Sequence, residues 1–99
     1  MLGVKVIEIR AFKNCRGLTE VECGDKLETI EQYAFYYCES LRTVTMPSVQ
    51  VIEKYAFCSC AQLTDLEVGE ELETIQGGAF QSCHKLRRIV IPLTDNMIE

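Results

Sequence analysis

Apolar residues recur along this chain with a period of 22 to 23 residues. The clearest marker is the dipeptide Ala-Phe, whose four phenylalanines are separated by 23, 22 and 23 residues: Phe12, Phe35, Phe57 and Phe80. A Cys follows each Phe after three residues, and a Leu follows each of these Cys after three more. An Ile also stands five residues before each Phe. Such internal repetition indicates stacked units, none of which can bury its apolar face alone.

Each unit predicts two extended segments and one turn region. Residues 41–46 alternate apolar and polar side chains, which is typical of a half-buried strand. A second short strand is expected in segments such as residues 72–75. The stretch from Ala-Phe to Cys is expected to form one or two helical turns with its apolar side chains facing inward. A Gly or Pro follows each segment of the first kind, so the chain is expected to turn there: Gly24, Pro47, Gly69 and Pro92.

Stacking such units about 4.8 Å apart aligns equivalent residues in columns. The sequence therefore predicts an α/β repeat: a short right-handed solenoid with a parallel sheet on one side and short helical turns and a second set of short strands elsewhere. Residues 1–99 are expected to form a single domain of about four coils. The pattern begins in mid-unit near Val4 and ends in mid-unit near Ile98, so we expect both ends to be incomplete.

The repeated unit resembles that of the BspA-type leucine-rich repeat family, L-x-x-I-x-L-P-x-x-φ-x-x-I-x-x-x-A-F-x-x-C-x-x-L, where φ is apolar. Residues 41–47 begin one continuous match, which goes on through Val49, Ile52, Ala56, Phe57, Cys60 and Leu63. The resemblance extends from about residue 4 to residue 92. It implies a leucine-rich-repeat solenoid without catalytic residues. It also implies a protein-binding role, since family members are commonly surface or secreted proteins of bacteria and protists that bind other proteins, host matrix proteins included.

Composition narrows the functional classes. The chain has 99 residues, of which 47% are hydrophobic and 25% charged, as in ordinary folded proteins. Its net charge of −5 argues against nucleic acid as a partner. The longest apolar run, residues 89–93, is too short to span a membrane, which needs about 20 residues. Cysteines that follow the repeat favour a reducing, intracellular compartment, with the cell surface or secretion as the alternative if a longer parent chain exists.

The positions of the cysteines favour a structural role over a catalytic or metal-binding one. Four of the six occupy one repeat column, where reduced, buried thiols can point at backbone carbonyls. Disulfides between coils and a metal site are the alternatives. Cys58 lies outside this column and is expected to be exposed, as the candidate reactive thiol. His84 occupies a repeat position that is expected to be solvent-exposed. Beside Cys83 and His84, the sequence contains no recurring third residue that would orient the histidine for catalysis. We therefore expect no enzyme activity, no cofactor and no bound metal.

The outward side chains of the first set of strands form the candidate protein-binding face. They are Glu20, Glu22, Arg42, Thr43, Thr45, Asp65, Glu67, Arg87 and Arg88. This face changes from acidic to basic along the stack; alternatively, its charges only stabilise the stack, by about 0.2–1 kcal/mol per pair. Tyr36 and Tyr37 are candidate interface aromatics.

The sequence thus predicts a non-enzymatic protein–protein interaction module that uses the sheet face and its rim. The alternatives are a structural or scaffold subunit bound through its end coils, or a fragment of a surface adhesin. Solenoids need polar caps, and neither end of this array has an obvious one. We therefore expect a homo-oligomer or a larger complex to form through the uncapped ends.

Overall fold

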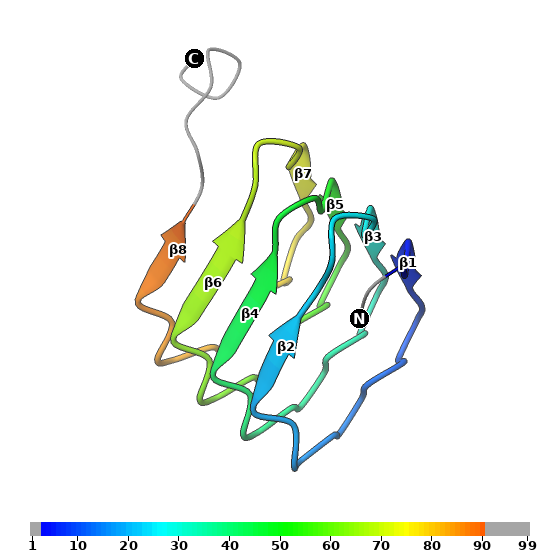
Figure 1. Cartoon of the computed structure of the whole chain (residues 1–99). Helices are drawn as coiled ribbons and strands as arrows, with labels where there is room; N and C mark the ends of the chain where they lie inside the picture. The colour runs from blue at the N-terminus through cyan, green and yellow to red at the C-terminus, as the bar shows by residue number, and fades with distance from the viewer. Residues whose placement is uncertain (1–2, 91–99) are drawn as a thin grey trace.

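The computed structural model describes residues 3–90, apart from the side chain of Val90, and there the chain winds through about four coils. Each coil adds one strand to each of two parallel sheets, which lie on two sides of the stack (Figure 1). The short-strand sheet consists of β1 (Val6–Ile7), β3 (Thr29–Ile30), β5 (Val51–Ile52) and β7 (Thr74–Ile75). The long-strand sheet consists of β2 (Glu20–Glu22), β4 (Thr43–Met46), β6 (Asp65–Val68) and β8 (Arg88–Val90). Coils 1 to 4 comprise residues 6–28, 29–50, 51–73 and 74–90. The predicted solenoid and both sets of strands are confirmed.

Strand pairing follows the sequence repeat without a slip. Val21 pairs with Val44, which pairs with Leu66, so equivalent residues stand side by side across the long-strand sheet. These side chains are buried, whereas their sequence neighbours point outward, as the two-residue period of a strand requires. A register shift by one residue would turn the apolar set to solvent, so burial fixes the register.

Phenylalanine rings form the centre of the core. Successive rings from Phe12 to Phe80 stack with centroids 5.1, 4.9 and 5.3 Å apart and interplanar angles of 7°, 2° and 6°. Phe35 and Phe57, in the two central coils, are completely buried, while the rings of the two outer coils are only partly buried. Each central ring is therefore covered on both faces by its equivalents in neighbouring coils.

The predicted helical turns are wrong, because residues 3–90 contain no helix. In the turn region, alternate N–H groups point along the stack instead of along a helix axis. The Ala11 N–H donates to the Glu8 carbonyl three residues back (3.0 Å), whereas the Phe12 N–H donates to the Ala34 carbonyl of coil 2 (2.7 Å). An α-helix needs bonds to the carbonyl four residues back and negative φ throughout. Here two columns of residues have φ near +60° or above: Arg10, Tyr33, Tyr55 and Gly78, and Asn14, Tyr37, Ser59 and Ser82.

Two glycines are required by close packing. Gly78 has φ +76°, and a Cβ there would lie 2.5 Å from the ring of Tyr55. A Cβ on Gly69 would overlap the carbonyl oxygen of Pro47. Glycine is the one residue that allows both approaches. Because the described part of the chain is built from strands and turns alone, it offers no helix that could cross a membrane.

We predict that the stacked rings dominate the stability of the fold. Phe57→Ala should lower the free energy of unfolding by about 3–5 kcal/mol, because it removes a ring covered on both faces. Phe12→Ala, in an outer coil where the ring is partly exposed, serves as the matched control and should cost clearly less. Urea unfolding followed by circular dichroism measures both. Equal losses for the two variants would contradict the role given to stacking.

Candidate functional site

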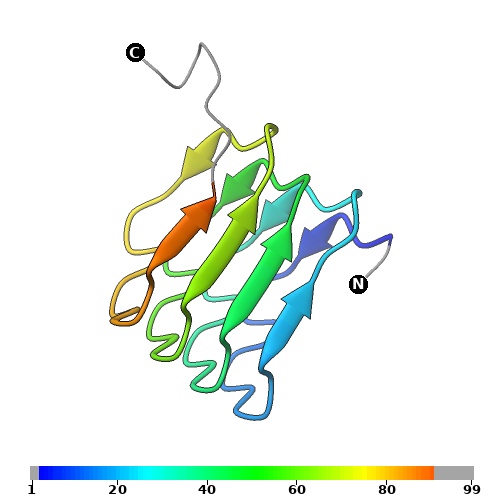
Figure 2. The same cartoon turned by 60° about the vertical axis from the view of Figure 1, so that its left-hand side comes forward.

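The candidate protein-binding face is the outer surface of the long-strand sheet, whose strands lie side by side (Figure 2). Strand register brings Glu20, Thr43, Asp65 and Arg88 into one row across the stack. A second row runs from Glu22 through Thr45 to Glu67. Arg42 and Arg87 precede their strands in a third row and are exposed. Strand register thus places seven of the nine predicted residues in rows on one face, and Arg42 and Arg87 lie at its rim, directly before β4 and β8. Six of the nine are exposed, and three are half-buried: Thr43, Thr45 and Asp65.

The centre of this face is a small hollow of about 150 Å³. Thr43, Thr45, Asp65, Glu67 and Arg88 contribute its polar lining. Thr45 Oγ1 lies 3.4 Å from Glu67 Oε2, so one wall is a hydrogen-bonded pair. Such a hollow offers two carboxylates, hydroxyl groups and one guanidinium to a side chain of a partner.

The two predicted interface aromatics belong to a larger cluster. Tyr37 is 44% exposed and meets the half-buried Tyr36 edge to face, with centroids 5.1 Å apart. Tyr36 contacts Tyr33 edge to face at 5.4 Å, and Tyr33 stacks on Tyr55 at 5.3 Å. All four tyrosines of the chain are therefore joined through ring contacts.

Cations of coil 1 cover the edge of this cluster. The Arg10 guanidinium lies 5.7 Å from the centroid of the Tyr33 ring, and Lys13 Nζ lies 5.9 Å from that of Tyr36. These distances are within the range of cation–π attraction. In both pairs, the cation and the ring occupy the same repeat column in neighbouring coils.

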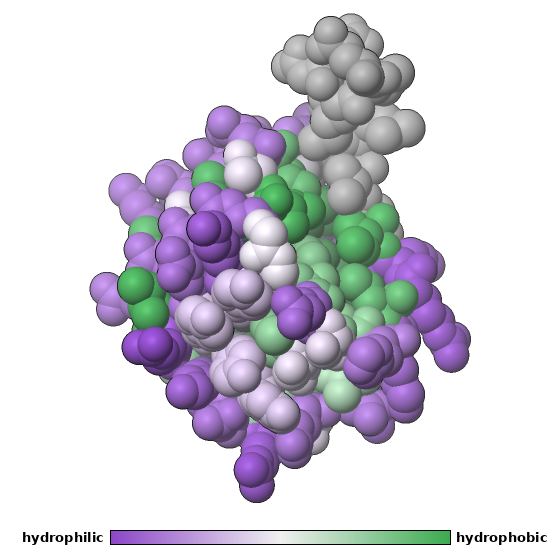
Figure 3. Space-filling model, turned by 180° about the vertical axis from the view of Figure 1, so that it is seen from behind, coloured by the Kyte–Doolittle hydropathy of each residue, from purple (hydrophilic) through white to green (hydrophobic). Residues whose placement is uncertain are grey.

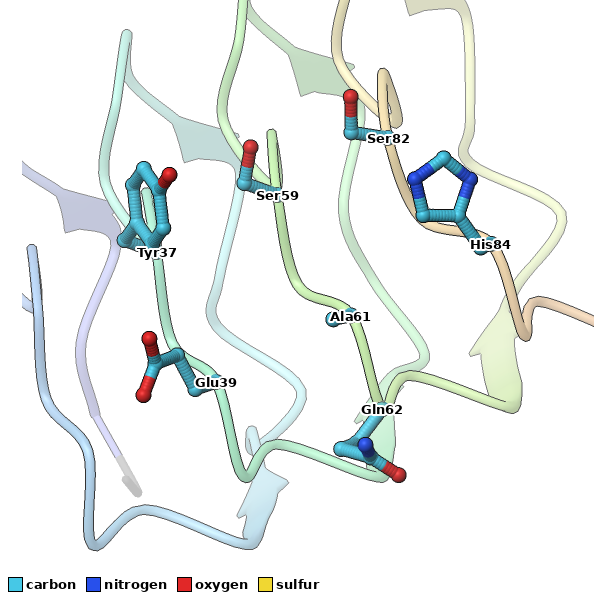
Figure 4. A pocket seen from close by; sticks show the side chains of 7 residues that line it. All are labelled: Tyr37, Glu39, Ser59, Ala61, Gln62, Ser82 and His84. Atoms are coloured by element: carbon cyan, nitrogen blue, oxygen red, sulfur yellow. The ribbon is translucent and has the colours of Figure 1, made fainter.

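Next to Tyr37, the turn side of the stack has an open hollow of about 510 Å³ (Figure 4). Its lining comes from coils 2, 3 and 4: Tyr37, Glu39, Ser59, Ala61, Gln62, Ser82 and His84. His84 is exposed there, as expected for a solvated column. The repeat pattern of the sequence does not predict this hollow.

The cysteine column forms a hydrogen-bonded ladder of thiols. Cys38, Cys60 and Cys83 each donate from Sγ to the carbonyl of the Phe in the preceding coil, at 3.1, 3.1 and 3.0 Å. All six cysteines are free thiols. Hydrogen bonds to the thiols of Cys38 and Cys83, together with burial, raise the pKa of Cys60 above its ordinary value. Residues 3–90 contain no cluster of three or more His, Cys, Asp or Glu arranged to hold a metal ion.

The expectation that Cys58 is exposed is wrong. Its side chain is only 7% exposed, and Sγ lies 3.6 Å from Ser59 Oγ. In its column, Cys58 stands between Tyr36 and Gln81, which are both longer side chains. The shorter Cys58 side chain therefore reaches less far outward than its neighbours, and it is not the accessible reactive thiol that the sequence indicated.

Both ends of the described stack expose apolar side chains that central coils bury. Ile75 in coil 4 is 41% exposed, whereas its equivalent in coil 3, Ile52, is fully buried, and Phe12 in coil 1 is half-buried, whereas its equivalent in coil 2, Phe35, is fully buried. At the coil 1 end, Phe12, Leu18 and Val21 line an open hollow of about 300 Å³. Figure 3 shows most of the hydrophobic surface of one face in its middle and right-hand part, with a smaller separate group at its left edge, among mostly polar side chains.

Comparison with known proteins shows to which family this repeat belongs. The model of the BspA type leucine-rich repeat region matches residues 2–99 with six copies. The chain belongs to this family. The crystal structure of a leucine-rich repeat protein from T. pallidum is similar in fold, with a TM-score of 0.54 and 25% sequence identity over 87% of this chain. The BspA-type chain spans about half of that protein, 51% of its length. No curated protein matches the sequence significantly.

Membership explains which residues repeat and which vary. Leucine-rich repeats of the BspA type commonly mediate protein–protein interaction and are generally not enzymes. Apart from the exposed Ala11 of coil 1, the Ala, Phe, Cys and Leu positions that carry the match lie in the core or pack against it. The residues between them, which form the sheet face and the turn side, are free to differ from coil to coil. The differences between the coils of this BspA-type repeat therefore lie mainly in the outward side chains.

The raised pKa of Cys60 predicts a loss of stability at alkaline pH. The folded state holds this proton more tightly than the unfolded state, whose thiol titrates near pH 8.5. The contribution of this thiol to stability is thus fully present below that pH and is lost as the pH rises above it, by up to about 1.4 kcal/mol per pH unit. Urea unfolding under reducing conditions between pH 7 and pH 10 should show a smaller decline in Cys60→Ala than in the unsubstituted chain.

Cys15→Ala is the control for this prediction, because it removes a partly exposed thiol of the same column in coil 1. Its decline with pH should follow that of the unsubstituted chain. If Cys60→Ala and the unsubstituted chain declined in parallel, the thiol ladder would not be the cause.

Proposed function

We propose that the chain is a non-enzymatic protein-interaction module that contacts its partner through the outer face of the long-strand sheet. The observation that carries the proposal is the arrangement of polar side chains in straight rows held by strand register. The backbone of β4 and β6 is held on both sides by parallel strands, and that of β2 and β8 on one side. Because this surface is preorganised, binding a partner costs the module little conformational entropy.

The charge along this face defines the partner. Coil 1 contributes Glu20 and Glu22, and coil 4 contributes Arg87 and Arg88, all with exposed side chains. The complementary surface is basic where it meets β2 and acidic where it meets β8. Electrostatic complementarity of this kind sets the orientation and speeds association more than it adds affinity.

Charge reversal tests the proposal. A partner captured with the immobilised chain and then purified should bind the double variant Glu20→Lys/Glu67→Lys at least about tenfold more weakly, a loss of about 1.4 kcal/mol. Its association rate should also fall and depend less on salt. The matched control is Glu28→Lys/Glu73→Lys, which reverses two exposed acids just before strands of the other sheet. Surface plasmon resonance measures both rates. Equal weakening by the two double variants, or by neither, would contradict recognition through this face.

A second candidate function is that of a structural subunit held through its end coils. The open hollow at the coil 1 end, whose apolar lining is Phe12, Leu18 and Val21, favours it, because exposed apolar patches mark interaction surfaces, and Ile9 of the same coil is 54% exposed. Ile9→Lys separates the two functions. It should leave binding unchanged if the sheet face is the site, and it should abolish binding or self-association if an end coil is the site. Light scattering reports self-association.

A further inference from the structure

The hollow beside Tyr37 results from a difference in side-chain size between neighbouring coils. In the column of Tyr37, coils 3 and 4 carry serines, and in the column of Glu39, coil 3 carries Ala61. Coil 3 therefore forms a low floor between taller side chains of coils 2 and 4. Figure 4 shows the rings of Tyr37 and His84 at opposite ends, with Ser59 and Ala61 between them. The volume of the hollow, about 510 Å³, lies within the range of ligand sites, about 300–1,000 Å³.

The lining is polar and carries little net charge. Gln62 Oε1 accepts a hydrogen bond from Lys85 Nζ (3.0 Å), which leaves the amide N–H groups of Gln62 able to donate. Glu39 Oε2 lies 3.9 Å from Arg16 Nε, so the one carboxylate in the lining is offset by a guanidinium. Sites for apolar ligands are lined mainly by hydrophobic side chains. These groups instead suit an uncharged ligand that both donates and accepts hydrogen bonds.

One aromatic ring adds a flat apolar surface to this polar lining. Tyr37 is 44% exposed, and its edge-to-face contact with Tyr36 at 5.1 Å holds its orientation. The C–H faces of a sugar ring pack on such a surface while its hydroxyl groups remain free to hydrogen-bond. Ser59 and Ser82 are equivalent residues of adjacent coils, and adjacent coils are about 5 Å apart, as their phenylalanine rings show. Hydroxyl groups on alternate carbons of a pyranose ring have a similar separation.

We propose that this hollow binds an uncharged oligosaccharide, with one sugar ring packed on Tyr37 and its hydroxyl groups bound by Ser59, Ser82, Gln62 and Glu39. The site lies on the turn side of coils 2 to 4, whereas the proposed protein-binding face is the long-strand sheet. The two surfaces share no residue. Each can therefore fail without the other.

The test is an NMR titration of the ¹⁵N-labelled 99-residue chain. The probes are maltotriose, cellotriose, mannotriose, lactose and N,N′-diacetylchitobiose, each added to millimolar concentration. We expect at least one probe to cause saturable shifts confined to amides in and beside the hollow, among them those of Tyr37, Ser59 and Ser82. Shifts over β2, β4, β6 and β8 would instead place the binding on the other face.

Variants then connect the shifts to the hollow. Ala61→Arg fills the floor with a side chain that coil 1 carries at the same position, Arg16, so the fold should accept it. It should weaken binding at least about tenfold, and Tyr37→Ala should do the same. Asn14→Ala is the control: Asn14 has the same positive φ as Tyr37 and Ser82 but does not line the hollow. Its affinity should stay within about twofold, and unchanged shifts elsewhere would show that each variant is folded.

Two results would overturn the proposal. The first is the absence of saturable shifts with all five sugars; if a short uncharged peptide, acetyl-Ala-Pro-Ala-amide, then saturates the hollow, this surface belongs to a protein partner. The second is sugar binding that Ala61→Arg leaves intact.

Discussion

Equivalent side chains must superpose from coil to coil, and every other feature of the molecule depends on this stacking. A coil alone cannot cover the ring of its Phe, satisfy the N–H groups that point along the stack, or bury its Cys thiol. The Phe57 ring lies between those of Phe35 and Phe80, and the Phe57 N–H donates to the Ala79 carbonyl of coil 4 at 2.8 Å. Stability is therefore a sum of contacts between neighbouring coils, as in other repeat proteins.

The turn side shows what this stacking overcomes. Within residues 3–90, seven residues other than glycine have φ near +60°, a region that costs L-residues about 1–2 kcal/mol. Three of them are tyrosines, Tyr33, Tyr37 and Tyr55, whose bulk gives them no preference for that backbone. Ring contacts and bonds such as that from the Tyr37 N–H to the Cys58 carbonyl (3.0 Å) hold them there. The inward-facing columns of side chains stabilise the fold, so the outward-facing columns can differ from coil to coil. These differences produce both the charged sheet face and the hollow beside Tyr37.

The period of the sequence predicts the columns of equivalent residues, because one residue type that recurs at a constant spacing indicates stacked coils. Strand register and the thiol ladder follow from this stacking. It does not predict the local backbone of the turn region. Ala, Phe and Cys at spacings of one and three fit a helix as well as successive turns, and only bonds between coils, such as that from Phe12 to Ala34, decide between them. Burial of Cys58 and the hollow over Ala61 depend on the sizes of neighbours in adjacent coils. Comparing residue volumes along each column would have indicated both, as well as the pairing of Tyr33 with Tyr55.

A double-mutant cycle on the phenylalanine column tests nearest-neighbour stacking most directly. The cycle compares Phe35→Leu and Phe57→Leu, alone and together, with the pair Phe35→Leu and Phe80→Leu, whose rings are separated by that of Phe57. Stacking predicts a coupling free energy of about 0.5–1.5 kcal/mol for the adjacent pair and additivity within about 0.5 kcal/mol for the separated pair. Additive losses for the adjacent pair, or equal coupling in both pairs, would contradict the account.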